Sequence, residues 1–202
     1  MGALSPRRLS RAANARTNDF ALAAFLWHPM PWVARAAAAN SSTPAWARKI
    51  ATKRKCLADV FLSRVDTPSD VIDRFARDAE LPAELLVLIA ENENTSPASL
   101  ARVASHPNVT ALVLYRAVRN PNTSHDTLDY IVTHSVTHTS PGSTETLHIF
   151  EAAAGRPDLP SNTLSWLARR CSDPAVLAAV ASNPNTPPAD AVFAALTHLT
   201  SK

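Results

Sequence analysis

Four histidines lie close together in a stretch that is rich in Ser and Thr. His134 and His138 are four residues apart, so on a helix they would share one face and could bind a metal ion. Asp126 or Glu145 would supply a further ligand. The surrounding sequence THSVTHTSPGSTETLH also contains Pro and Gly, which disfavour the rigid frame that metal ligands need. We therefore interpret residues 133–147 as a polar insertion, a solvated loop, and we predict no metal ligands.

Basic residues near the start of the chain offer a different chemistry. Residues 1–64 contain 11 Lys or Arg residues but only two acidic residues, Asp19 and Asp59, a net charge of +9, whereas residues 65–202 carry −6. In a stacked array, neighbouring basic residues could contact phosphate groups. The alternative is a solvated charged face. The candidate binding patch, called the basic patch below, consists of Arg35, Arg48, Lys49, Lys53, Arg54 and Lys55.

Three tryptophans, Trp27, Trp32 and Trp46, fall in the same part of the sequence. Interleaved with basic residues, their rings could stack on the bases of a nucleic acid. The alternative, which we favour, is that these large side chains seal the end of a core that otherwise consists of small residues.

Motifs of the common enzyme classes are absent from the sequence. It contains no nucleophile elbow, H-E-x-x-H metal motif, Walker loop or dinucleotide fingerprint, and its three Gly residues make phosphate-cradling loops unexpected. We therefore predict no catalytic residues, no cofactor and no enzyme activity.

The cysteines and the apolar residues bear on where the protein resides. Cys56 and Cys171 lack the spacing of a metal site or a disulfide framework, which favours a reducing compartment, and we predict a cytoplasmic protein. No stretch approaches the roughly 18 apolar residues of a membrane span, so we predict no membrane association.

A four-residue motif recurs along the chain and marks the boundaries of the helices that would carry the histidines, basic residues and tryptophans. It is identical, NPNT, at residues 120–123 and 183–186. Its fourth positions are separated by 26, 24, 28, 28, 36 and 27 residues, and six of the seven are Thr. Such self-similarity is the signature of a repeat architecture. The copies begin at Asn14, Asn40, Arg64, Asn92, Asn120, Arg156 and Asn183.

The motif predicts that one helix stops and another starts. Asn readily adopts the left-handed conformation that ends a helix, and Thr at the fourth position caps the next helix. Pro44, Pro68 and Pro187 then occupy the first helical position, where a missing N–H costs little.

Apolar stripes flank these turns. Residues two, three, six and seven places before a turn are apolar in six of the seven copies, as expected for one helix face. A second stripe lies five and eight places after the fourth position, although Ile50 and Phe193 sit one place early. The first turn lacks the preceding stripe, so we predict no such helix before it and interpret residues 1–16 as a basic cap or tail.

With these features the chain resembles the variant leucine-rich repeat family, an α-solenoid related in architecture to HEAT and armadillo arrays. The likeness is carried by HPMPWVARAAAANSSTP, RVASHPNVTALVLYRAVRNPNT and VLAAVASNPNTPP. The resemblance implies repeats that pair an α-helix with a shorter, often 3₁₀, helix, and an interaction surface rather than an activity. Some members carry a Cys cluster ahead of the repeats; this chain has none, so no iron–sulfur site is expected.

We predict one all-α domain over residues 1–202: a right-handed α-solenoid of about seven short repeats of 24–28 residues within residues 17–200, without a sheet. The leading functional hypothesis is a non-enzymatic scaffold that binds a macromolecular partner, most naturally a protein. The alternative is nucleic-acid binding through the basic N-terminal repeats. A third hypothesis is an α-solenoid enzyme that acts on nucleic acid or a small ligand.

Overall fold

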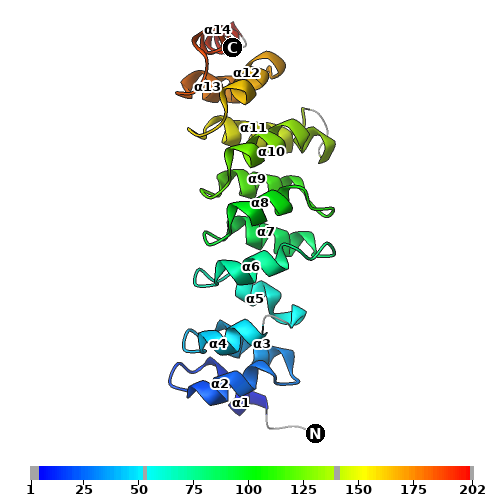
Figure 1. The fold of residues 1–202 in the computed structure, drawn as a ribbon, viewed down its shortest axis with the longest axis vertical. Helices are drawn as coiled ribbons and strands as arrows, with labels where there is room; N and C mark the ends of the chain where they lie inside the picture. Colours follow the sequence, from blue (N-terminus) through cyan, green and yellow to red (C-terminus); the bar gives the residue numbers. More distant parts are fainter. Residues whose placement is uncertain (1–4, 52–53, 139–141, 201–202) are drawn as a thin grey trace.

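The described chain is entirely helical. A computed structural model describes residues 5–51, 54–138 and 142–200, and within them it contains fourteen α-helices, one 3₁₀ helix and no strand. The helices follow one another along the long axis, so the two ends of the chain lie at opposite ends of an elongated molecule (Figure 1). The all-α prediction is confirmed, and the right hand of the coil stays a prediction.

Two layers of helices make up the array. Layer A contains the helices after each recurrent turn: α2 (Asp19–Leu26), α4 (Ala45–Ala51), α6 (Ser69–Phe75), α8 (Pro97–Ala104), α10 (His125–His138), α12 (Ser161–Arg170) and α14 (Pro188–Thr200). Layer B contains the helices before each turn: α1 (Ser5–Ala13), α3 (Pro31–Ala39), α5 (Ala58–Leu62), α7 (Ala83–Glu91), α9 (Ala111–Arg119), α11 (Thr144–Ala154) and α13 (Pro174–Ser182). In layer B each helix packs against the next one of the layer, and in layer A α2 packs against α4, α8 against both α6 and α10, and α12 against α14.

Both layers consist of α-helices, in contrast to what the family resemblance implied. Among the described residues, the 3₁₀ conformation is confined to η1 (Lys55–Leu57), which leads into α5. Where the structure describes the chain, the second helix of each repeat is therefore an α-helix rather than a 3₁₀ helix.

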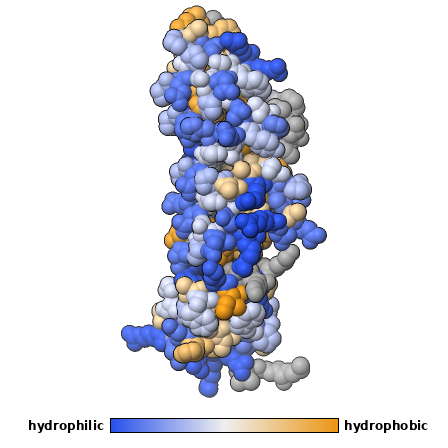
Figure 2. Space-filling model, viewed as in Figure 1, coloured by the Kyte–Doolittle hydropathy of each residue, from blue (hydrophilic) through white to orange (hydrophobic). Residues whose placement is uncertain are grey.

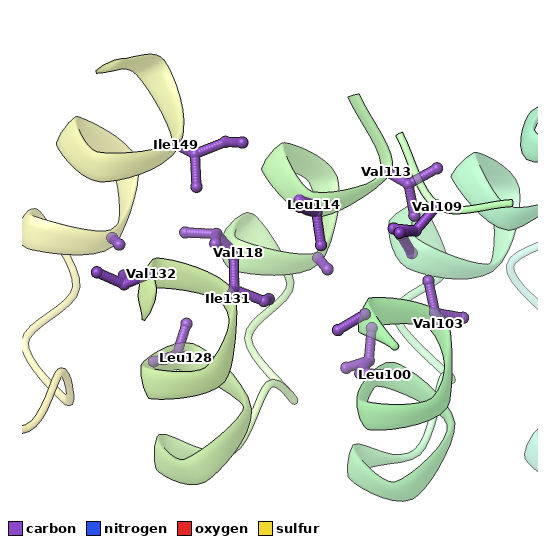
Figure 3. Close-up of a cluster of buried hydrophobic side chains, with 14 of the residues drawn as sticks. Leu100, Val103, Val109, Val113, Leu114, Val118, Leu128, Ile131, Val132 and Ile149 are labelled. Atoms are coloured by element: carbon purple, nitrogen blue, oxygen red, sulfur yellow. The ribbon is translucent and has the colours of Figure 1, made fainter. Parts of the chain in front are cut away.

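The apolar stripes form the core between the two layers, as their spacing predicted. In the middle of the array the buried side chains come from α8, α9 and α10 (Figure 3): Leu100, Val103, Val113, Leu114, Val118, Leu128 and Ile131. Because each repeat touches only its neighbours, this core continues from one repeat to the next rather than forming a single central cluster.

Two apolar residues that seemed to shift the stripe lie on the surface instead. Ile50 and Phe193 are about half exposed, at 47% and 51%. The eighth places after the turns are taken by Ala51 and Ala194, both fully buried. The prediction of a shifted stripe is wrong because the register is constant and small alanines occupy the core positions.

The first sixteen residues contain a helix that the sequence pattern did not predict. Helix α1 packs against α2 and α3 and buries Ala12, while Arg7 and Arg11 stay exposed. Among the described side chains of α1, Ala12 alone enters the core, so no apolar stripe marks this helix. It covers the N-terminal end of layer B.

The polar insertion extends two helices, so most of its described residues are helical rather than a loop. Residues 133–138 form the last turns of α10, and residues 144–147 begin α11; residues 139–141 lie outside the described residues. The hydroxyl groups of this segment stabilise the helices locally. The Thr133 hydroxyl donates to the Asp129 carbonyl at 2.8 Å, and Ser143 Oγ accepts from the Thr146 N–H at 3.3 Å as the N-cap of α11.

The first asparagine of each turn links one repeat to the one before it. Asn120 has φ −71° and ψ 126°, and no described non-Gly residue has a positive φ, so the predicted left-handed conformation is wrong. Its Oδ1 accepts from the Asn122 N–H at 2.9 Å. Its Nδ2 donates to the carbonyls of Ala90 at 2.8 Å and Asn92 at 3.0 Å, in the preceding turn. The side chain of Asn120 therefore acts as a rung between repeats.

The same rung recurs along the array. Asn92 donates to the Leu62 carbonyl and Asn183 to the Ala154 carbonyl, at 2.8 and 2.6 Å. A second amide reinforces the contact at the third turn position: Asn122 Nδ2 donates to the Glu93 carbonyl at 2.6 Å. Equivalent bonds are made by Asn94 and Asn185. We call this series of inter-repeat hydrogen bonds the amide ladder.

The threonine at the fourth position donates a hydrogen bond to a backbone carbonyl of the preceding helix and does not cap the next one. Thr95 Oγ1 donates to the Ile89 carbonyl at 2.6 Å, and all six threonines of the turns make this bond to the residue six places earlier. The predicted N-cap role is wrong because the hydroxyl turns back toward carbonyls that the helix end leaves free. Pro68, predicted at the first helical position, is itself the N-cap residue of α6.

Arginine replaces asparagine in two rungs. Arg64 Nη1 donates to the Ala39 carbonyl at 2.7 Å, and Arg156 Nη1 donates to the Asn120 carbonyl at 2.7 Å. Each guanidinium also binds the aspartate two places later, Asp66 or Asp158, at 2.7 Å. Arg-x-Asp is thus a charged equivalent of Asn-x-Asn. The guanidinium donates to the carbonyls of the preceding repeat as the amides do, and the aspartate accepts from the guanidinium.

Replacing Asn120 tests the amide ladder. We expect Asn120→Ala to lower the free energy of unfolding by about 1–3 kcal/mol, because the buried Ala90 carbonyl loses a donor. Asn162→Ala is the matched control: this exposed asparagine of α12 makes no side-chain hydrogen bond within the described residues, and its loss should change stability by less than about 0.5 kcal/mol. Urea unfolding measures both. Equal effects of the two substitutions would show that the rung does not stabilise the array.

Candidate docking face on the N-terminal repeats

The basic patch binds acidic residues of the same chain. Arg35 on α3 binds the carboxylate of Asp59 on α5, with Nη1 3.0 Å from Oδ1. On α4, Arg48 Nη1 lies 2.6 Å from Asp66 Oδ2. Each of these pairs links one repeat to the next.

Two further members of the patch also bind groups of the same chain, and the remaining two have side chains outside the described residues. Lys49 Nζ lies 2.8 Å from the Asp70 carboxylate. Arg54 donates to the Leu26 and His28 carbonyls at the end of α2. The side chains of Lys53 and Lys55 lie outside the described residues. Every described member of the patch therefore has an intrachain partner, although Arg35 and Lys49 stay about half to two-thirds exposed.

The ion pairs of this region shift the pKa values of their carboxyl groups. The Arg64 guanidinium beside Asp66 holds the pKa of that carboxyl well below its usual range, and Arg48 lowers it further. Lys49 lowers the pKa of Asp70 in the same way, through a hydrogen bond to the carboxylate. The charges of these basic residues are thus largely balanced within the array.

The three tryptophans do not seal the core. Trp27, Trp32 and Trp46 are 52%, 50% and 53% exposed, so the interpretation that we favoured is wrong. The N-terminal core is filled by leucines, Phe61 and alanines, and the alanines of α3 let neighbouring helices approach closely. The small side chains of Ala34, Ala37 and Ala38 thus occupy core positions, and the indole rings lie outside the core.

Large apolar side chains instead gather on the outer side of α2 and α4. Phe20 and Trp46 occupy the third place after their turns and are 81% and 53% exposed. Ile50 follows Trp46 by one helical turn, and Trp27 lies just after the last residue of α2. We call Phe20, Trp27, Trp46 and Ile50 the aromatic face.

Later repeats do not continue this face. The third place after the turn holds small or polar residues from the third repeat onward: Asp70, Ala98, Asp126, Asn162 and Ala189. Figure 2 shows a mostly hydrophilic surface along one side of the molecule, with apolar residues near the C-terminal end and over the N-terminal repeats. The aromatic face is therefore a local feature of the first two layer A helices.

Unpaired basic residues lie on α1 and in the turn that leads into α2. Arg7 and Arg11 on α1, and Arg16 in the turn before α2, are exposed and their side chains make no hydrogen bond or ion pair within the described residues. Arg8 instead bonds His28 Nε2 at 2.9 Å, which holds α1 alongside the end of α2. Within the first two repeats, the basic side chains that remain available are thus upstream of the predicted patch.

One residue of the face, Phe20, was not recognised from the sequence. The signal was present, because Phe20 stands at the same place after its turn as Trp46. Only the structure shows that this place faces outward in every repeat.

The histidine segment and the cysteines offer no assembled site in the described residues. The His134 ring stacks on Tyr130 with 4.2 Å between centroids, and the side chain of His138 lies outside the described residues. No group of three potential His, Cys, Asp or Glu ligands occurs within the described part of the chain. Burial raises the pKa of the Cys171 thiol to about 11, so this cysteine stays protonated near neutral pH.

Comparison of the chain with protein-family models, with curated proteins and with solved structures found no match. The variant leucine-rich repeat relationship stays a prediction. Within the described residues, every helix falls short of the length and apolarity that a membrane span requires.

Acid should weaken the array through Asp66. A lowered native pKa means that the unfolded chain, with an aspartate pKa near 3.9, takes up the proton first. The stabilising contribution is therefore complete above about pH 5 and is lost as pH falls through the native pKa. We expect the urea midpoint of Asp66→Asn to be lower than wild type at pH 7 and to decline less between pH 5 and 3. Parallel pH curves for the two proteins would contradict the assigned ion pair.

Proposed function

We propose that this protein is a non-enzymatic helical-repeat scaffold that binds a protein partner through the aromatic face. The supporting observation is that Phe20, Trp27, Trp46 and Ile50 stay exposed on two neighbouring helices. Removing one such side chain from water is worth about 1.5–3 kcal/mol. Trp and Phe are also enriched at the centres of protein interfaces, where a few residues dominate the binding energy. An exposed face with this composition of aromatic and aliphatic side chains is well suited to a protein partner.

Nucleic-acid binding is the second candidate. Exposed aromatic rings and the unpaired Arg7, Arg11 and Arg16 favour it, because single strands bind to basic grooves with stacking rings. Against it, phosphate contacts supply most of such binding, and the described members of the basic patch already bind within the chain. A nucleic acid at the patch would have to replace those contacts.

The proposed scaffold is a cytoplasmic protein. Cys56 and Cys171 are both free thiols, and Cys56 is exposed. An exposed thiol that lacks a disulfide partner suits a reducing compartment.

Partner capture with and without nuclease tests the proposal. The wild-type chain should retain a protein from a cytosolic extract after nuclease treatment, and Phe20→Ser/Trp46→Ser should lose it, because the apolar anchors are gone. Both replaced side chains are exposed, so the fold should be unchanged by circular dichroism. Val65→Ser is the control, since Val65 is 83% exposed but lies outside the aromatic face.

Two outcomes would contradict this function. A captured protein that is released by nuclease would favour the nucleic-acid candidate. Capture that survives the double replacement would place the docking surface elsewhere on the array.

A further inference from the structure

We propose that the segment that docks on the aromatic face is acidic: a short peptide stretch whose carboxylates flank apolar anchor residues. This inference rests on the proposed function, because it concerns what the aromatic face binds. It depends on the ion pairs in these repeats: several aspartates are paired with basic residues of the same chain, and several arginines are not paired.

The charges that remain near the face are positive. Three aspartates of the neighbouring repeats are already paired with basic residues: Asp59 with Arg35, Asp66 with Arg48 and Arg64, and Asp70 with Lys49. Among the described residues up to the end of α4, Asp19 is the one acidic side chain without such a partner, against Arg7, Arg11 and Arg16. A partner with negative charge would balance this excess.

These arginines lie on elements that adjoin α2. Arg16 precedes Phe20 by four residues at the start of α2, and α1 packs beside the same helix. At the other end of α2, the Arg54 guanidinium lies 5.9 Å from the centre of the Trp27 ring. Protein interfaces commonly have an apolar centre and a polar rim, and complementary charge speeds encounter and fixes orientation. Apolar anchors would therefore sit on the rings, and carboxylates would lie toward the arginines.

A short peptide fits this charge distribution better than a long polyanion. Arg7, Arg11 and Arg16 lie on α1 and in the first turn. Exposed arginines such as Arg102 also occur further along, but layer A there carries exposed Asp70 and Asp126 at the place of Phe20 and Trp46. Residues 65–202 carry a net charge of −6. A nucleic-acid strand that followed the array would meet these carboxylates, while a peptide confined to α1, α2 and α4 would not.

Selection from a phage library of random dodecapeptides tests the inference with the full chain. We expect the enriched peptides to combine Trp, Phe or Leu with several Asp or Glu residues. The most enriched peptide, synthesised with a fluorophore, should bind at least tenfold more weakly at 300 mM than at 50 mM salt, because screening weakens exposed charge pairs. This salt test uses only the wild-type protein.

Variants then separate charge from apolar contact. Arg7→Glu/Arg11→Glu/Arg16→Glu should weaken binding of this peptide at least tenfold, and Phe20→Ser/Trp46→Ser should abolish it. Arg102→Glu is the matched control, because Arg102 is exposed on α8 and makes no side-chain contact of either kind within the described residues. It should bind the peptide as the wild type does.

The outcomes distinguish this inference from the proposed function. Enriched peptides that need Phe20 and Trp46 but carry no acidic residues would overturn the acidic partner and leave the docking face standing. Acidic peptides that still bind after Phe20→Ser/Trp46→Ser would overturn both. Tighter binding of a 20-nucleotide oligothymidine than of any selected peptide would overturn the inference in favour of a nucleic acid.

Discussion

The amide ladder is the interaction on which the array depends. Its helices are five to fourteen residues long, and isolated helices of this length are marginal in water. Their stability must come from contacts between repeats, and the apolar core supplies most of that but does not by itself fix the register. The Asn120 amide reaches the Ala90 and Asn92 carbonyls of the preceding turn and so sets the position of one repeat on the next.

The ladder tolerates variation elsewhere because it uses backbone acceptors. Arg156 reaches the Asn120 carbonyl even though the interval before it is the longest in the chain. The additional residues lengthen α10 and α11 without breaking the contact. The outer side of layer A is equally unconstrained, and the same place can hold Phe20, Trp46 or a small residue. A fixed inner scaffold with a variable outer face is what a binding protein of this kind requires.

Sequence spacing predicted the turns, the apolar stripes and the all-α class, because each depends on helix period and repeat length. It did not predict the role of Asn120, since local helix-end rules consider only its own backbone and the acceptors belong to another repeat. The exposure of Trp46 was missed for a similar reason: an aromatic residue next to an alanine-rich helix suggests core filling. Ala34 and other small side chains occupy the core there, and only the assembled layers show that the Trp46 ring lies outside it.

Side-chain amide hydrogen exchange by NMR tests the ladder most directly. The Nδ2 protons of Asn92, Asn120 and Asn183 should exchange slowly and show scalar coupling across the hydrogen bond to the carbonyl carbons of the preceding turn. Asn14 occupies the first turn, no other turn of this kind precedes it among the described residues, and its amide donates to no described group. Its protons should exchange rapidly. Equal, rapid exchange of all four amides would contradict the ladder.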